Sequence, residues 1–417
     1  MPQSDTTRST VLDRALATSR TIAMTGPLAS LDADRIRERL APALTPTSRL
    51  TVVPDPASKT WAHDVSPIPI SVRPDLAELS PGEILTRLRN APVPAGRPEY
   101  LLCGSWLVLE HSHGIGDGRV GLEQFAGLAG RDEAAMAANL ERSLPANSAW
   151  HAARRHLLRN PGRLREIARL RAANAAGAPA GPTRSLSDWR TTRHVVATSM
   201  PADRARALRA AVADSGMKAS SAAVTVALWR AAVTAQGVSI DDRTQVLFDC
   251  RRYLDPTHAA DHGNLAVGIP IRFPDGATPP EVGDRIRAVA GSGWPAAILA
   301  SAELRGLLPK SGAGIEPEAS DDVQVPDRLR LSVSDMGRID MFDDVDWDPT
   351  APSHHLYASL EPDGPDAATT FVSEIGGVRS LTTTFYRAFI DPALIEAAQQ
   401  HLCDDPVSLF ERLLTRS

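Results

Sequence analysis

The sequence predicts a mixed α/β protein built from two lobes, and three observations lead to this fold class. The chain has 417 residues, which is the length of about two or three ordinary domains. Strand-like and helix-like patterns occur in both halves. Between the halves, residues 174–183 are rich in alanine, glycine and proline, as in a flexible linker. We therefore expect an N-terminal lobe over residues 1–180 and a C-terminal lobe over residues 181–417.

The first half contains a predicted strand, turn and helix in direct succession. Leucine and isoleucine at spacings of four first predict a helix over residues 31–44, with Ser30 as its cap. The apolar run at residues 100–110 predicts one buried strand. It leads directly into HSHGIGDG at residues 111–118, and a helix is predicted over residues 120–128. Functional groups often lie at such strand ends, where a rigid scaffold holds a loop.

The second half is predicted to alternate between strands and helices. The strands are expected over residues 192–199, 245–249, 265–273, 328–335, 369–375 and 380–389. The helices are expected over residues 201–216, 220–237, 392–402 and 407–414.

The composition excludes several classes of protein. Hydrophobic residues make up 43% of the chain and the net charge is −5, so the chain is an ordinary globular protein and not a general nucleic-acid binder. Its three cysteines lie far apart without the spacing of metal ligands, which argues against a disulfide framework or a metal site. No apolar run has the length of a signal peptide or a membrane-spanning helix. We expect a cytoplasmic protein without integral membrane association.

The residues 113–118 carry the strongest chemical signal. An imidazole, which titrates near neutral pH, can accept a proton from a hydroxyl or an amine, and His113 is such a group. Asp117 can fix the local backbone and a neighbouring arginine, while Gly118 lets the backbone approach a reacting carbonyl. A structural alternative stays open, in which His113 and Asp117 form a hydrogen-bonded pair that closes the turn.

Three segments together carry a resemblance to a known superfamily. The first is HxxxDG after a core strand, at residues 113–118. The second is FDCRR at residues 248–252, followed by Gly263-Asn264. The third is LSVSDMG at residues 331–337. In order and spacing, these segments resemble the condensation domains and acyl-thioester-dependent acyltransferases. Many members have two adjacent histidines, whereas this chain has Ser112 before His113 and a histidine one place earlier, His111.

The resemblance implies two chloramphenicol-acetyltransferase-like α/β sandwich lobes with an active-site tunnel between them. His113 is then the general base, and Asp117 pairs with Arg251 across the lobes, although Arg252 is a competing candidate. The implied site consists of catalytic, supporting and substrate-binding residues. These are His113, Asp117 and Gly118 as catalytic residues, Arg251 and Asp249 as support, and Ser334, Asp335 and Asn264 as substrate contacts. Asp249 as a strand cap and Gly263-Asn264 as a simple turn remain alternatives.

The function implied by the resemblance is acyl transfer from a coenzyme A or carrier-protein thioester to a hydroxyl or amine of a small molecule, in natural-product metabolism. We expect no permanently bound cofactor and no metal, with acyl-CoA or a phosphopantetheine-linked thioester as co-substrate and an acyl carrier protein as candidate partner. An inactive module that recruits a carrier protein is the alternative, and lipid or wax-ester synthesis at a membrane surface is a third option. The arginine-rich residues 154–171 are either a solvated helix face or a phosphate-docking surface.

Overall fold

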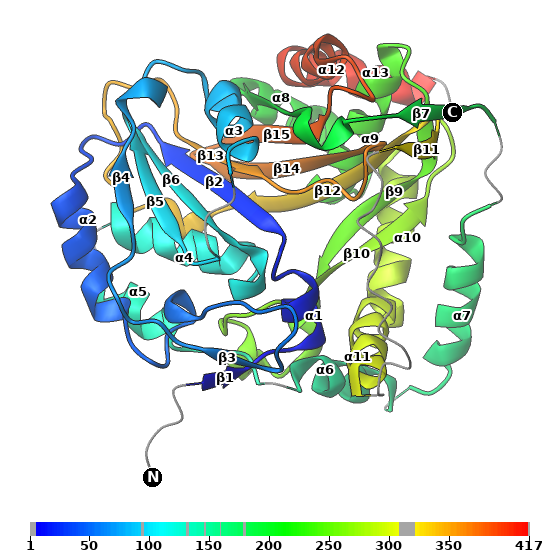
Figure 1. Cartoon of the computed structure of the whole chain (residues 1–417). Coiled ribbons are helices and arrows are strands. Elements are labelled where there is room, and N and C mark those ends of the chain that lie inside the picture. Colours follow the sequence, from blue (N-terminus) through cyan, green and yellow to red (C-terminus); the bar gives the residue numbers. More distant parts are fainter. Residues whose placement is uncertain are drawn as a thin grey trace.

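Two mixed β-sheets flanked by helices organise the chain (Figure 1). The computed structural model describes residues 6–92, 96–130, 133–145, 147–158, 160–177, 181–307 and 322–415. One sheet has five strands in the order β13-β2-β6-β5-β4, and the other has six in the order β10-β9-β12-β14-β15-β8. This two-lobed α/β arrangement confirms the predicted fold class, while the tunnel between the lobes stays a prediction.

The five-stranded sheet belongs mainly to the first half and lies at the left of Figure 1. Its strands are β2 (Arg20–Gly26), β4 (Ile70–Val72), β5 (Glu99–Cys103), β6 (Trp106–Ser112) and β13 (His355–Ser359). Apolar side chains alternate between its two faces. Leu107 and Leu109 pack in the same core as Phe125 of α4 (Gly118–Ala129), and Val108 packs with Ile84 of α3 (Pro81–Arg89). The sheet is therefore buried on both faces.

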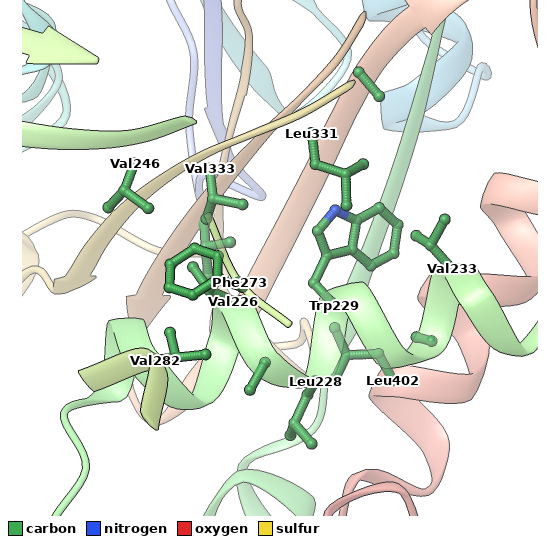
Figure 2. Close-up of a cluster of buried hydrophobic side chains, with 14 of the residues drawn as sticks. Val226, Leu228, Trp229, Val233, Val246, Phe273, Val282, Leu331, Val333 and Leu402 are labelled. Atoms are coloured by element: carbon green, nitrogen blue, oxygen red, sulfur yellow. The ribbon is translucent and has the colours of Figure 1, made fainter. Parts of the chain in front are cut away.

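The six-stranded sheet carries the larger core. Its strands are β8 (Arg193–Met200), β9 (Ile240–Asp249), β10 (Ala266–Arg272), β12 (Leu329–Arg338), β14 (Ala367–Ile375) and β15 (Val378–Tyr386). Helix α9 (Ser221–Ala235) packs against it and contributes Leu228 and Trp229, both fully buried with Val333 of β12 in one cluster (Figure 2). The other face of β14 points toward the first lobe, because Phe371 belongs to the same core as α4.

The remaining helices and short strands complete the two lobes. The helices are α1 (Val11–Ala15), α2 (Ala33–Leu40), α5 (Glu133–Leu140), α6 (Ser148–Leu157), α7 (Arg163–Ala173), α8 (Ala202–Asp214), α10 (Pro279–Ser292), α11 (Trp294–Leu307), α12 (Pro392–Asp404) and α13 (Pro406–Thr415). The short strands β1 (Thr6–Arg8) and β3 (Thr60–Ala62) pair with each other, as do β7 (Thr183–Leu186) and β11 (Val323–Pro326). Within the described ranges, no helix is both long and apolar enough to cross a membrane.

One strand crosses the predicted division of the chain. Strand β13 lies late in the sequence but pairs antiparallel with β2, with Leu356 opposite Thr25. The division at residue 180 stays a prediction, and residues 178–180 of the expected linker lie outside the described residues. The pairing of β13 nevertheless ties the second half into the sheet of the first half.

Two predicted elements of the first half are wrong in detail. The expected single strand over residues 100–110 is a hairpin, because Gly104 takes a φ of +60° and lets Cys103 pair with Trp106. The expected helix over residues 31–44 is shorter, since Asp32 rather than Ser30 caps it and Pro42 follows its end at Leu40. In the second half, all the predicted helices and strands are present, with shifted ends.

Candidate active site

The motif begins where strand β6 ends, and the neighbouring segment holds this end in place. Residues 113–115 form a 3₁₀ turn directly after Ser112. The Ser112 hydroxyl donates to the Ala17 carbonyl at 2.7 Å and accepts from the Gly114 amide at 3.1 Å. The amide of His113 donates to the Ser19 carbonyl at 2.7 Å. Ser112 is therefore a structural cap.

The side chain of His113 is not used as a structural hydrogen-bonding group. Its Nδ1 is buried and has no hydrogen-bond partner among the described residues, and the residue as a whole is half-buried. The carboxylate of Asp117 is bonded to other groups instead of to His113. The alternative of a His113–Asp117 pair that closes the turn is therefore wrong for this structure.

The backbone under His113 is braced from two distant segments. The Asn264 amide Nδ2 donates to the carbonyl oxygens of His113 at 2.9 Å and Gly114 at 3.1 Å, and to Asp13 Oδ1 at 2.9 Å. Arg49 donates its Nε to the Ile115 carbonyl at 2.8 Å, and its Nη2 lies 3.6 Å from Asp13 Oδ1. All three side chains are buried. The predicted substrate contact of Asn264 stays a prediction, and its amide hydrogens are directed at the motif backbone.

Asp117 joins the two halves of the chain through a two-pronged ion pair with Arg251. Its Oδ2 lies 2.7 Å from Nη1 and its Oδ1 lies 3.2 Å from Nη2 of the guanidinium. The same carboxylate caps α4 by accepting from the Arg119 amide at 3.3 Å. Burial lowers the pKa of Arg251, but the nearby Asp117 carboxylate prevails and raises it. This geometry selects Arg251 over Arg252, whose side chain is exposed.

Asp249 supports the same arginine from the end of β9. Its Oδ1 accepts from the Arg251 amide at 2.9 Å and lies 3.3 Å from Nη1. The Asp249 side chain is 57% exposed, so its charge is much better solvated than that of Asp117. Its contribution to holding Arg251 is accordingly smaller.

Gly118 stands at the first position of α4, exposed, with its amide free. The Asp117 amide donates to the Gly263 carbonyl, and the Arg119 amide donates to the Asp117 carboxylate. The Gly118 amide between them has no acceptor among the described residues. A Cβ at Gly118 would lie 3.5 Å from Cε of Met336 on β12. The second half of the chain thus faces this helix start.

Two further glycines of the motif are closely packed. A Cβ on Gly114 would lie 2.9 Å from Ala17 Cα, and one on Gly116 would overlap Val120.

Ser334 and Asp335 lie on opposite faces of β12. Alternation along the strand places Ser334 on the same side as Met336, which packs with the core of the first lobe. Asp335 lies on the side of α9, where its carboxylate accepts from Arg379 Nη2 and Thr225 Oγ1, each at 2.8 Å, and from the Gly337 amide at 2.8 Å. Substrate binding by either residue stays a prediction, and the Asp335 carboxylate is saturated by protein donors.

Two buried histidines surround the motif. His111 lies within β6 with its Nδ1 2.9 Å from the Ser112 carbonyl, and burial lowers its pKa to about 4. His262 is 1% exposed, and neither ring nitrogen has a partner among the described residues. Burial lowers its pKa to about 4 as well, and the charge of Arg119 adds to this effect. Both rings are therefore neutral at cellular pH.

Sequence reasoning missed two of the residues that hold the site. Asp13 and Arg49 lie far before the motif and carry no recognisable pattern around them. Their role depends on a tertiary contact between α1, residues 49–51 and the turn at His113. The one local signal is the Thr10 cap of α1, whose capping box includes Asp13 itself.

Solved structures share this architecture, whereas no protein-family model and no curated protein matches the sequence. The nonribosomal peptide synthetase FmoA3 aligns over 100% of this chain with a TM-score of 0.58 and 16% identity. The condensation domain of the Monacolin K polyketide synthase MokA aligns over 98% of this chain and 97% of its own, with a TM-score of 0.57 and 12% identity. This chain has the condensation-domain fold.

The same fold also occurs in a domain named for a different reaction. The epimerization domain from the third module of tyrocidine synthetase B aligns over 97% of this chain and 93% of its own, with a TM-score of 0.55 and 11% identity. The chain spans 45% of the FmoA3 chain. The fold is thus shared between proteins of different names, and the reaction has to be argued from the site.

We predict that Asp117→Asn and Arg251→Gln each destabilise the protein strongly. Removing one partner leaves a buried charge unpaired, which typically costs about 3–5 kcal/mol. The double variant should lose less than the sum of the two, and urea unfolding of all four proteins measures this coupling. Asp249→Asn is the matched control, with an expected loss under about 1 kcal/mol because its carboxylate is exposed. Additive losses would contradict a direct interaction.

We predict that stability falls as the pH drops from about 6.5 toward 4. His111, His262 and His355 each have a pKa lowered to about 4 by burial, whereas an unfolded histidine titrates near about 6.5. Between these values the unfolded chain binds more protons, so the stability present above this window is lost through it. Urea midpoints at pH 7.5 and 5.0 measure the effect. His262→Gln should reduce the difference between them, whereas His401→Gln on α12 should leave it unchanged.

Proposed function

We propose that the protein is an acyltransferase that moves an acyl group from a coenzyme A or carrier-protein thioester to a hydroxyl or amine of a small molecule. The observation that carries this proposal is the position of His113. Its backbone is bonded to Ser19 and Asn264, and Arg49 holds the neighbouring carbonyl of Ile115. Its imidazole has no structural partner among the described residues. A rigid backbone with an uncommitted ring is what a general base requires.

In the proposed reaction His113 handles one proton in two steps. The imidazole takes the proton from the acceptor hydroxyl or amine as its oxygen or nitrogen attacks the thioester carbonyl. The tetrahedral intermediate then expels the thiolate, which receives the proton from the imidazolium. The carbon–sulfur bond breaks and the new ester or amide bond forms, so the enzyme returns to its initial state. This cycle calls for no covalent intermediate on the protein.

The start of α4 supplies a donor for the negative charge that develops on the carbonyl oxygen. The Gly118 amide is exposed and has no acceptor among the described residues. It lies at the positive end of a twelve-residue helix. Fixed donors of this kind stabilise the intermediate more than the ground state because they require no reorganisation.

Asp117, Arg251 and Asn264 act as positioning residues in this proposal. The Asp117–Arg251 pair fixes the helix start that carries Gly118, and Asn264 fixes the carbonyl of His113. The inactive recruitment module keeps the same fold but has no use for an imidazole and a helix-start amide that lack partners among the described residues. Lipid or wax-ester synthesis would use the same histidine. The acyl donor that the protein consumes distinguishes this reaction from acyl transfer to a small molecule.

We predict that His113→Ala lowers the rate of acyl transfer by about 10²- to 10⁴-fold, because the proton acceptor is lost. The protein is incubated with acyl-CoA and acyl-carrier donors and a small-molecule extract, while thiol release and products heavier by one acyl group are followed by mass spectrometry. His401→Ala is the matched control and should retain activity. An unchanged rate in folded His113→Ala would contradict the base, and binding of acyl carriers without turnover by wild type would favour the recruitment module.

We predict that Gly118→Pro lowers kcat by about 10²- to 10³-fold by removing one amide donor. Proline is well tolerated at the first position of a helix, and the extended backbone of Asp117, with φ −76° and ψ −176°, suits a residue before proline. Gly118→Ala keeps the amide and should lose far less, since its Cβ makes only an ordinary contact with Met336. Equal losses in the two folded variants would contradict the role of the amide.

A further inference from the structure

A basic hollow lies between α6, α7 and the 3₁₀ turn Cys250–Tyr253, outside the motif. It has a volume of about 340 Å³ and is lined by Arg155, His156, Asn160, Arg163, Arg252, Tyr253, Leu254 and Pro256. Its arginines come from three separate segments of the chain, namely α6, α7 and the turn that follows β9. A solvated helix face alone does not explain why they converge on one cavity.

The positive charges of the hollow are only partly neutralised. Arg155 pairs with Asp255 at 3.0 Å. Neither Arg163 nor Arg252 lies within ion-pair distance of a carboxylate in the described part of the chain. Arg163 Nη1 instead contacts both ring nitrogens of His156. Arg252 lies over the Tyr253 ring, with 5.9 Å from its Cζ to the ring centroid. Glu166 is the carboxylate whose charge reaches His156.

His156 lies between Arg163 and the backbone of α10 in this hollow. Its Nε2 lies 3.0 Å from the Gly291 carbonyl, and Arg163 Nη1 contacts both nitrogens of the ring. Burial lowers the pKa of His156, and the nearby charges of Arg163 and Arg252 act in the same direction. Arg163 thus contacts an imidazole, and no carboxylate of the described residues lies within ion-pair distance of it.

Shared lining residues connect this hollow to the candidate active site. A second hollow of about 350 Å³ shares Arg155 and Leu254 with it. A third, of about 120 Å³, shares Ser148 with the second and is lined by Asn264, the residue that holds the His113 carbonyl. The three hollows are thus neighbours in turn, from the arginines to Asn264.

We infer that the hollow lined by Arg155, Arg163 and Arg252 binds a phosphate group. Guanidinium forks match the oxygen atoms of phosphate esters and hold them by charge-assisted hydrogen bonds. The local charge agrees, because residues 148–173 contain seven arginines and one glutamate in a chain of net charge −5. The identification of this phosphate with that of a coenzyme A or phosphopantetheine donor rests on the proposed function, and the phosphate site itself does not.

The test compares probes with and without phosphate on the full chain. Calorimetric titration with coenzyme A, 4′-phosphopantetheine and pantetheine should show tighter binding of the two phosphorylated probes, by about tenfold or more. Arg163→Gln and Arg252→Gln should each weaken the phosphorylated probes by about tenfold while leaving pantetheine unchanged. Arg169→Gln, an exposed charge on α7 outside the hollow, is the matched control and should bind like wild type.

Further measurements separate the possible outcomes. Melting curves check that each variant is folded, and Arg252 is exposed, so its substitution tests the site even where Arg163→Gln unfolds. Equal binding of pantetheine and 4′-phosphopantetheine to wild type would overturn the inference, as would an equal loss in Arg169→Gln. Holo-carrier protein and coenzyme A are also titrated separately. The one whose affinity falls in the Arg252→Gln variant is the source of the phosphate. His113→Ala should leave all these affinities intact, so failure of the base and failure of the phosphate site are distinguishable.

Discussion

The ion pair between Asp117 and Arg251 is the interaction on which the arrangement of the candidate site depends. Asp117 belongs to the start of α4 in the first half and Arg251 to the turn after β9 in the second. Arg251 also donates to the carbonyl oxygens of Asp261 and Gly263, at 2.9 and 3.0 Å. One guanidinium therefore positions both the helix start that carries Gly118 and the loop that carries Asn264, which in turn holds His113.

A buried ion pair stabilises a protein only when further hydrogen bonds satisfy both charged groups. The Asp117–Arg251 pair has such hydrogen bonds. Desolvation of two charges opposes the pair, and good geometry with further hydrogen bonds has to offset it. The Asp117 carboxylate receives two guanidinium bonds, the Arg119 amide and the Leu265 amide at 3.3 Å. Asp335 repeats this pattern with Arg379, Thr225 and the Gly337 amide. Protein donors engage both carboxylates, which favours structural roles for both residues.

The sequence predicted the strand–turn–helix unit and most of the second half because each has a local signal. The Asp117–Arg251 pair has no such signal and was implied only by the resemblance. An apolar run followed by glycines predicts a strand end, and spaced apolar residues predict α9 and α12. No local signal predicts the contacts of Asp13 and Arg49 near the motif or the pairing of β13 with β2. These features depend on tertiary contacts between distant segments. The hairpin at Gly104 was missed because apolar residues on both sides of the glycine look like one continuous buried strand.

The residues before His113 leave the proposed proton transfer to His113 alone. Ser112 is bonded on both sides to backbone and has no ring to share a proton. His111 keeps an imidazole nearby, yet its burial within β6 lowers its pKa to about 4, so the ring stays neutral near neutral pH. A charge on His113 also disfavours one on His111. The neutral, buried ring of His111 is thus compatible with a neighbouring imidazolium during the reaction, whereas a second exposed histidine would compete for the same proton.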